Sequence, residues 1–305
     1  MSTLRIGTRG SVLARTQSSE AAAALRGLGH EVELVEITTH GDLSTDPLAV
    51  IGGTGVFVSA VREALLRGDV DVAVHSLKDL PTAVPEGITL AAVPLREDPR
   101  DVVVARDGLT LGELPVGSTV GTGAPRRVAQ VAALGLGVEL VGVRGNVDTR
   151  VDKVLAGELD AVLLARAGLA RLGRLDLVTE TLDPIQMLPA PGQGALAVEC
   201  RSEDALAGVV RDALDHRRSR AAVEAERALL GDLEAGCSAP VGALAVIAEG
   251  DHGEEVWLRA VALSLDGGLA VRRSATGGLD DAGGVGRKLA AEMLSDGAAE
   301  LIHPG

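Results

Sequence analysis

The sequence predicts an α/β fold, because short apolar strands alternate with helical segments along most of its 305 residues. In the first part, strand-like runs at 4–8, 32–38 and 70–75 are separated by helical patterns at 11–28 and 55–66. The alternation begins again near residue 101, with strands at 102–105, 119–121, 138–141 and 161–164 and helices at 126–134 and 147–155. Near-continuous apolar strands joined by helices predict mostly parallel sheets that are covered on both faces.

The last part of the chain follows a different pattern. A strand at 195–200 and a helix at 204–214 still fit the alternation, and this strand could return to the first sheet. A helix at 220–233 is then followed by grouped strands at 241–248, 256–265 and 269–274 and by a helix at 286–296. Grouped strands with a final helix are typical of a small α+β domain, so we expect two α/β domains and a smaller third one.

Composition excludes several classes of protein. Hydrophobic residues make up 46% and charged residues 24%, which is the balance of a globular chain. A net charge of −14 and an aromatic content of 1% disfavour a nucleic-acid surface, which needs basic residues and stacking rings. Cys200 and Cys237 form no CxxC pair, and no apolar run is long enough to span a bilayer. No signal peptide is visible, so we expect a cytoplasmic protein without a structural metal or a membrane partner.

Two loops at strand ends carry polar groups in the first domain. Arg9 and Ser11 follow the first strand, where a helix N-cap beside a guanidinium favours an anion. The alternative is an ordinary capped helix start. The segment His75–Asp79 places a hydroxyl, a cation and a carboxylate after another strand, as general acid–base catalysis requires, although a solvated turn has the same composition. Ligands of α/β folds bind at the carboxyl ends of strands, so both loops are candidates.

Arginines follow two strands of the second domain. Arg126 and Arg127 begin a helix after a Gly-rich turn and Pro125, where the helix dipole disfavours cations. Arg144 and Arg150 flank Asn146, a possible N-cap. With little acid nearby in sequence, these arginines predict a ligand that carries several carboxylates or phosphates, because guanidinium forks bind such groups bidentately. Salt bridges to neighbouring acids are the alternative.

Cys237 lies in a turn between Gly236 and Pro240. A loop cysteine can act as a nucleophile, although no histidine partner is recognisable, or it can attach a prosthetic group. Cys200 ends an apolar strand and is expected to be a core thiol.

Taken together, these segments resemble the porphobilinogen deaminase (hydroxymethylbilane synthase) family. The resemblance spans nearly the whole chain, through Arg9 and Ser11, 75–79, 97–101, Arg126 and Arg127, 144–146, 191–194 and 236–237. It implies two periplasmic-binding-protein-like lobes around a cleft plus a small α+β domain. Domain 1 would be 1–94 and 196–214, domain 2 would be 95–195 and domain 3 would be 215–305.

The same resemblance implies an activity. The enzyme would be a cytoplasmic, monomeric transferase that joins four porphobilinogen molecules head to tail, releasing ammonia each time, to give hydroxymethylbilane for tetrapyrrole and heme biosynthesis. A dipyrromethane primer would be held by a thioether to Cys237, and Asp79 would be the catalytic carboxylate. The implied binding residues are Arg9, Ser11, Ser76, Lys78, Thr122, Arg126, Arg127, Arg144, Asn146, Arg150, Arg171 and Gln193.

The chain also departs from the family pattern. The loop 50–57 has no lysine, the pair Gly123 and Ala124 replaces hydroxyl residues, and His40 stands where an arginine is common. Three other interpretations remain open at this point. They are a two-lobed solute receptor, an enzyme acting on a phosphate ligand, and a family member without activity.

Overall fold

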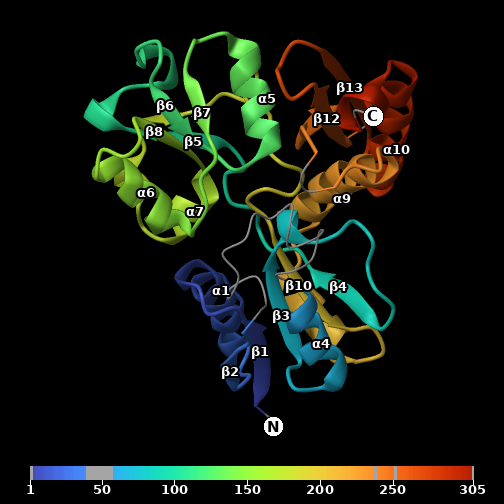
Figure 1. Cartoon of the computed structure of the whole chain (residues 1–305). Coiled ribbons are helices and arrows are strands. Elements are labelled where there is room, and N and C mark those ends of the chain that lie inside the picture. The colour runs from blue at the N-terminus through green and yellow to red at the C-terminus, as the bar shows by residue number, and fades with distance from the viewer. Residues whose placement is uncertain (1–2, 39–57, 237–238, 251–252, 304–305) are drawn as a thin grey trace. The chain divides into compact units, whose positions relative to one another are not determined.

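The computed structural model describes residues 3–38, 58–236, 239–250 and 253–303 (Figure 1). Contacts divide the chain into two compact units. Unit 1 comprises residues 1–97 and 195–220, and unit 2 comprises residues 98–194 and 221–305. Within the described residues, no helix is both long and apolar enough to cross a membrane.

Unit 1 is built on a five-stranded mixed sheet in the order β2-β1-β3-β10-β4. Its strands are β1 (Leu4–Thr8), β2 (Val32–Glu36), β3 (Val72–Ser76), β4 (Ile88–Ala92) and β10 (Leu196–Arg201). β1 runs parallel to β2 and β3, whereas β10 runs antiparallel to β3 and β4. Four of the five strands therefore run in one direction, and the sheet is mixed because the strand from the distant segment enters it in the opposite direction. Its predicted return to the first sheet is confirmed.

Helices cover both faces of this sheet. α1 (Val12–Gly27) and α8 (Leu206–Leu214) pack on one face around Leu25, Val198 and Val210. α4 (Ser59–Arg67) packs on the other face through Val61 and Leu65. Alternate residues of β3 point to the two faces, which is why the strand reads as continuously apolar.

Unit 2 contains a second five-stranded mixed sheet in the order β7-β6-β8-β5-β9. Its strands are β5 (Asp101–Ala105), β6 (Thr119–Gly121), β7 (Glu139–Val141), β8 (Ala161–Ala165) and β9 (Glu180–Thr181). β6 is parallel to β7 and β8, but β5 is antiparallel to β8 and β9. The helices are α5 (Pro125–Leu134), α6 (Val147–Leu155) and α7 (Arg166–Arg171).

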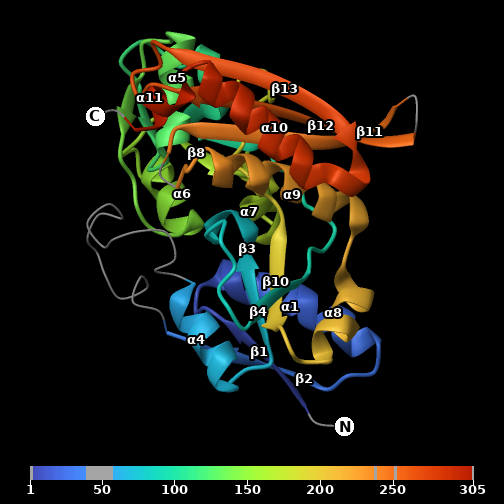
Figure 2. The same cartoon turned by 90° about the vertical axis from the view of Figure 1, so that its right-hand side faces the viewer.

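The C-terminal part of unit 2 is a three-stranded antiparallel sheet with helices on one face. Its elements are α9 (Arg217–Asp232), β11 (Val241–Gly250), β12 (Gly253–Leu263), β13 (Ala270–Gly278), α10 (Ala282–Ser295) and α11 (Ala298–Ile302). Leu229, Leu258 and Leu289 lie in the core of this part, and Figure 2 shows α10 running along the sheet. Val261 and Leu263 on the other face pack with Ala129 of α5. The predicted α+β pattern is confirmed, and the three-domain division remains a prediction.

Candidate functional site

In unit 1, the predicted polar loops lie at one edge of the sheet. β1 and β3 are parallel neighbours, so the segment of Arg9 and Ser11 and the segment Ser76–Asp79 both leave at their carboxyl ends. Ser11 is the N-cap of α1, and its hydroxyl accepts a hydrogen bond from the amide of Ala14 at 3.3 Å. The predicted cap is confirmed, and the two loops are brought to the same edge.

A glutamine that the sequence did not single out joins these loops. Gln17 on α1 is buried, and its Nε2 donates to Ser76 Oγ at 2.9 Å. Asp79 ends the short 3-10 helix Leu77–Asp79 and is exposed, so its carboxylate is accessible from solvent. Gln17 lies just past the first turn of the helix that follows Arg9, and this position is the only feature of the sequence that could have indicated its role.

The structure separates His75 from Asp79. His75 is buried, and its Nε2 lies 3.4 Å from Oε2 of Glu199. Arg62 donates to both oxygens of Glu199, at 2.9 and 2.6 Å. Burial alone would raise the pKa of Glu199, but its interactions with Arg62 and His75 together outweigh burial and lower that pKa to about 2. His75 therefore faces an interior ion pair, as a core histidine does.

In unit 2, one sheet edge collects residues from strands of opposite direction. β6, β7 and β8 are parallel, and the segments carrying Thr122, Arg144 and Arg171 follow their carboxyl ends. β5 runs the other way, with its first residue, Asp101, paired to Ala165 at the end of β8. A carboxylate therefore lies at the edge where the arginine loops emerge.

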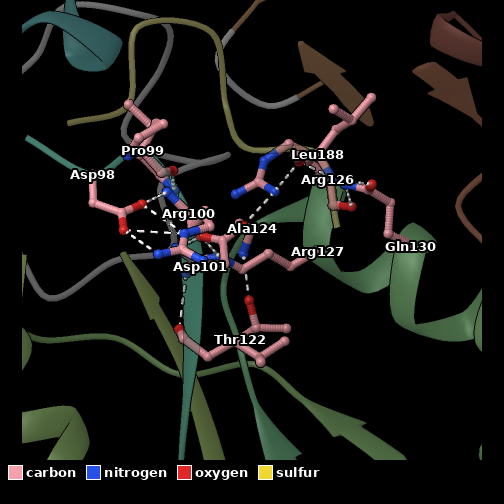
Figure 3. A network of polar contacts seen from close by, with 12 residues as sticks. Asp98, Pro99, Arg100, Asp101, Thr122, Ala124, Arg126, Arg127, Gln130 and Leu188 are labelled. Atoms are coloured by element: carbon pink, nitrogen blue, oxygen red, sulfur yellow. Dashed lines mark hydrogen bonds and ion pairs between the residues drawn. The ribbon is translucent and has the colours of Figure 1, made fainter. Parts of the chain in front are cut away.

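Asp101 binds both adjacent arginines of α5 (Figure 3). Its Oδ2 accepts from Arg126 Nη1 at 2.7 Å, and its Oδ1 accepts from Arg127 Nη2 at 2.8 Å. Gln193 Nε2 donates to the same Oδ1 at 2.8 Å. Asp101 is fully buried, and Arg126 and Arg127 are only 4% and 5% exposed. Burial opposes ionisation of Asp101, yet the two guanidiniums hold its pKa far below the usual range.

This network corrects one part of the sequence interpretation. Little acid lies near Arg126 and Arg127 in sequence, but in the structure Asp101 bonds to both, which is the salt-bridge alternative that the sequence left open. The sequence pattern indicated ligand-binding loops only at the carboxyl ends of the strands. Asp101 reaches the site from the amino end of a strand that proved antiparallel.

Arg144 and Arg150 add positive charge at the start of α6. Asn146 is the N-cap of this helix, as predicted, and its Oδ1 accepts from the amide of Thr149 at 2.8 Å. Arg150 Nε donates to the carbonyl of Gly145, which has a φ of 105°. Burial lowers the pKa of Arg150, and the charges of Arg127 and Arg144 lower it further. These guanidiniums therefore lie close enough to repel one another, and an anionic ligand would relieve that repulsion.

The remaining predicted residues of unit 2 lie around this cluster. Arg171 Nη2 donates to the carbonyl of Gly194 at 3.0 Å. Thr122 is buried, and its hydroxyl accepts from the amide of Ala124 at 3.3 Å. A Cβ at Gly123 would lie 2.8 Å from the carbonyl oxygen of Val143, so a hydroxyl residue there would require the loop to shift.

Several predicted features lie outside the described residues, namely Cys237, His40 and the loop 50–57. Cys200 is described and buried; burial raises its pKa to about 12, as expected for a core thiol. Within the described ranges, no cluster of three or more histidine, cysteine or acidic side chains could hold a metal ion.

These observations define an α/β protein with a cluster of buried and half-buried arginines, suited to a multiply charged anion, at one sheet edge. Two family models match the chain. The model described as "Porphobilinogen deaminase, dipyromethane cofactor binding domain" covers residues 4–208, and the model of the C-terminal domain of the same family covers residues 220–295. The chain belongs to the porphobilinogen deaminase family.

Relatives and solved structures were also found. Porphobilinogen deaminase of Mycobacterium tuberculosis H37Rv is 59% identical over 304 residues, which is 98% of both chains. The protein of the same name from Nocardia farcinica is 57% identical over 98% of this chain and 88% of its own length. Among solved structures, the methionine-binding protein MetQ matches 69% of this chain and 89% of its own, with a TM-score of 0.45 at 12% identity. Lipoprotein Tp32 from Treponema pallidum matches 69% and 90%, with a TM-score of 0.46 at 13% identity.

Proposed function

We propose that this chain is a hydroxymethylbilane synthase, which condenses four porphobilinogen molecules head to tail and releases one ammonia molecule with each condensation. The product would be hydroxymethylbilane, the linear precursor of tetrapyrroles such as heme. The family of the chain supports this assignment. The observation that carries it in the structure is the cluster of Arg126, Arg127, Arg144 and Arg150, whose charge Asp101 offsets only in part.

The ligand chemistry fits this cluster. Each pyrrole ring carries an acetate and a propionate, so a dipyrromethane and the chain that grows from it accumulate carboxylates. Guanidinium forks bind carboxylates bidentately, and the repulsion around Arg150 favours such a counter-charge. The residues that would hold these carboxylates are Arg126, Arg127, Arg144, Arg150, Asn146, Thr122, Arg171 and Gln193.

Covalent tethering completes the proposal. Cys237 would hold the dipyrromethane through a thioether, and this cofactor would supply the pyrrole carbon to which the first substrate is joined. The cysteine would act as an anchor, so no Ser-His-Asp arrangement is needed. The exposed Gly236 lies next to it, at the end of the segment that follows α9.

Asp79 would act on the substrate. When ammonia leaves porphobilinogen, positive charge develops on the ring and is shared with its nitrogen. An ionised carboxylate that accepts a hydrogen bond from that N–H stabilises the charge and can receive or return a proton. Asp79 is accessible from solvent, and Arg9, Ser11, Ser76 and Lys78 at the same sheet edge would bind the substrate's carboxylates.

The proposal is tested by incubating the purified protein with porphobilinogen. We expect release of ammonia together with a linear tetrapyrrole whose mass corresponds to four condensed units. We also expect a monomer that acts in the cytoplasm, and light scattering of the purified protein checks its mass in solution. Absence of ammonia release by a folded protein that carries its cofactor would contradict the assignment.

A further inference from the structure

We propose that Asp101 is a positioning residue for the reaction, which sets the direction in which Arg126 presents its guanidinium to the ligand. This inference rests on the proposed function, because it assumes that the arginine cluster binds the carboxylates of the growing chain. Asp101 itself would not touch the substrate. Its role follows from the donors that its hydrogen bonds hold in place and from the donors of Arg126 that remain available to a ligand.

The carboxylate of Asp101 is saturated by protein donors. Oδ1 accepts from Arg127 Nε at 3.1 Å, from Arg127 Nη2 at 2.8 Å and from Gln193 Nε2 at 2.8 Å. Oδ2 accepts from Arg126 Nη1 at 2.7 Å. The side chain is fully buried, and the charges of Arg126 and Arg127 lower its pKa, which favours the ionised form. It therefore acts as a fixed internal anion.

A second anchor fixes each guanidinium. Arg126 Nη1 also donates to the carbonyl of Leu188 at 2.6 Å, and Arg127 Nη1 donates to the carbonyl of Leu163 at 2.9 Å. Leu188 is itself held by Gln130, whose Oε1 accepts from the Leu188 amide at 2.8 Å and whose Nε2 donates to its carbonyl at 3.0 Å. Figure 3 shows Leu188 and Gln130 beside Arg126. Neither guanidinium is free to rotate without breaking these bonds.

This anchoring leaves one edge of Arg126 for a ligand. Both of its protein hydrogen bonds involve Nη1, and within the described residues Nε and Nη2 donate to no protein acceptor. The Nε–Nη2 edge is the pair of parallel donors that matches the two oxygens of a carboxylate. Arg127, in contrast, uses its Nε, Nη1 and Nη2 within the protein. The structure therefore assigns different roles to the two neighbours: Arg126 presents a fork to the ligand, whereas Arg127 contributes its charge to the cluster while it holds Asp101.

The same network joins two segments that are far apart in sequence. Gln193 Nε2 donates both to Asp101 and to the carbonyl of Pro99, at 2.8 Å each. The segments around residues 98 and 194 are two of the three places at which the chain passes between its two units. Asp101 thus fixes the arginine fork relative to both of these segments within unit 2.

The test compares Asp101→Asn with a matched control, Asp160→Asn. Asp160 belongs to the same unit and accepts from Thr119 N and Arg106 Nε, but it pairs at the opposite end of β6 and β8. Asparagine has the shape of aspartate, but its NH2 group would face the N–H donors that now bond to the carboxylate, so at least one of these hydrogen bonds would be lost. We expect Asp101→Asn to lower kcat for porphobilinogen roughly ten- to hundredfold, because misplaced groups of this kind cost about that much. KM should change less, since the oligopyrrole remains tethered, and Asp160→Asn should stay within about twofold of wild type.

Chemical rescue separates charge from packing. Asp101→Ala removes the carboxylate and leaves room for a small anion beside two guanidiniums. We expect added formate to restore part of kcat, whereas formamide, which has a similar shape and no charge, should restore none. Equal rescue by both compounds would overturn a role for the charge, and an Asp101→Asn enzyme within twofold of wild type would overturn the positioning role.

If neither Asp101→Asn nor Asp101→Ala accumulates in folded form, the kinetics of Asp101→Glu are measured instead. The longer side chain keeps the charge but places its oxygens differently, so it cannot keep all four hydrogen bonds at this fully buried position, and we expect kcat well below that of wild type. An unchanged kcat would overturn the proposal. Wild-type activity on porphobilinogen is measured alongside, because its absence would refute the proposed function. If the wild type is active and the variants have the same kcat, only the role of Asp101 is refuted.

Discussion

At the residue scale, the decisive property of the site is the excess of guanidiniums over carboxylates. Asp101 offsets part of the charge of Arg126 and Arg127, while Arg144 and Arg150 add to it. The sequence could predict the helix caps at Ser11 and Asn146 and the group of arginines. The segment 97–101 belongs to the family resemblance, but the sequence could not place Asp101 beside the arginines, because a carboxylate at a strand start reaches this edge only when the strand is antiparallel.

Replacing Arg126 by lysine tests the need for a planar fork. Nη1 of Arg126 binds Asp101 and Leu188, and one ammonium cannot do this and also offer two parallel donors to a ligand. We expect Arg126→Lys to lower kcat/KM roughly tenfold or more, measured by ammonia release. Arg106→Lys, at an exposed ion pair with Asp160, is the control and should behave as wild type. Unchanged kinetics for Arg126→Lys would refute bidentate binding at this position.

Removal of the Asp79 carboxylate tests its proposed role in catalysis. Because Asp79 is exposed, Asp79→Ala should unfold at nearly the wild-type temperature, yet it should lose nearly all turnover. Asp69→Ala, at another exposed carboxylate of the same unit, should retain both stability and activity. Near-normal ammonia release by the Asp79 variant would exclude this residue as the catalytic group.

At the scale of elements, the antiparallel strands β5 and β10 explain what the sequence pattern missed. The periodicity predicted most helices and strands, and β6 and α6 coincide with their predicted ranges. It did not predict β4 or the short elements β9, α7 and α11, and it carried no information on strand direction. Direction depends on long-range pairing, such as that of Leu196 with Ser76, which no local pattern encodes.

A buried glutamate of α9 links two elements of unit 2. Glu226 is fully buried and accepts from the amides of Gly192 at 2.6 Å and Ala245 at 2.8 Å. We expect Glu226→Ala to lower the free energy of unfolding by about 2–4 kcal/mol, because two buried amides lose their acceptor. Urea denaturation measures this effect, with the exposed Glu292→Ala as control. Equal stability of the two variants would mean that the hydrogen bonds of Glu226 to Gly192 and Ala245 do not stabilise the fold.

The ion pair between α4 and β10 predicts a dependence of stability on pH. Glu199 has a pKa of about 2 in the folded protein and an ordinary one of about 4.5 when unfolded, so the unfolded state binds a proton first. Its contribution, at most about 3 kcal/mol, is present above pH 4.5 and is lost as the pH falls towards 2. Urea denaturation over this range should show a smaller loss for Glu199→Gln than for wild type. Parallel curves for the two proteins would contradict this assignment, and exposed Glu33→Gln should match wild type.

At the scale of the whole molecule, the net charge of the chain is opposite in sign to the charge of the arginine cluster. The chain carries a net charge of −14, yet it concentrates arginines at one sheet edge of unit 2. The family could be identified from the sequence because its motifs are spread in a fixed order over nearly the whole length of the chain. The division into units could not be predicted in the same way, because the C-terminal elements pack on α5 through side chains distant in sequence.

The most direct test of the account is the intact mass of the purified protein. After expression in cells that make porphobilinogen, we predict a mass above that of the bare chain by two linked pyrrole units. Cys237→Ser should have only the mass of its polypeptide, whereas Cys200→Ser should keep the addition, because the Cys200 thiol is buried. A folded wild-type protein at its bare polypeptide mass would contradict a tethered oligopyrrole, and with it the purpose assigned to the arginine cluster.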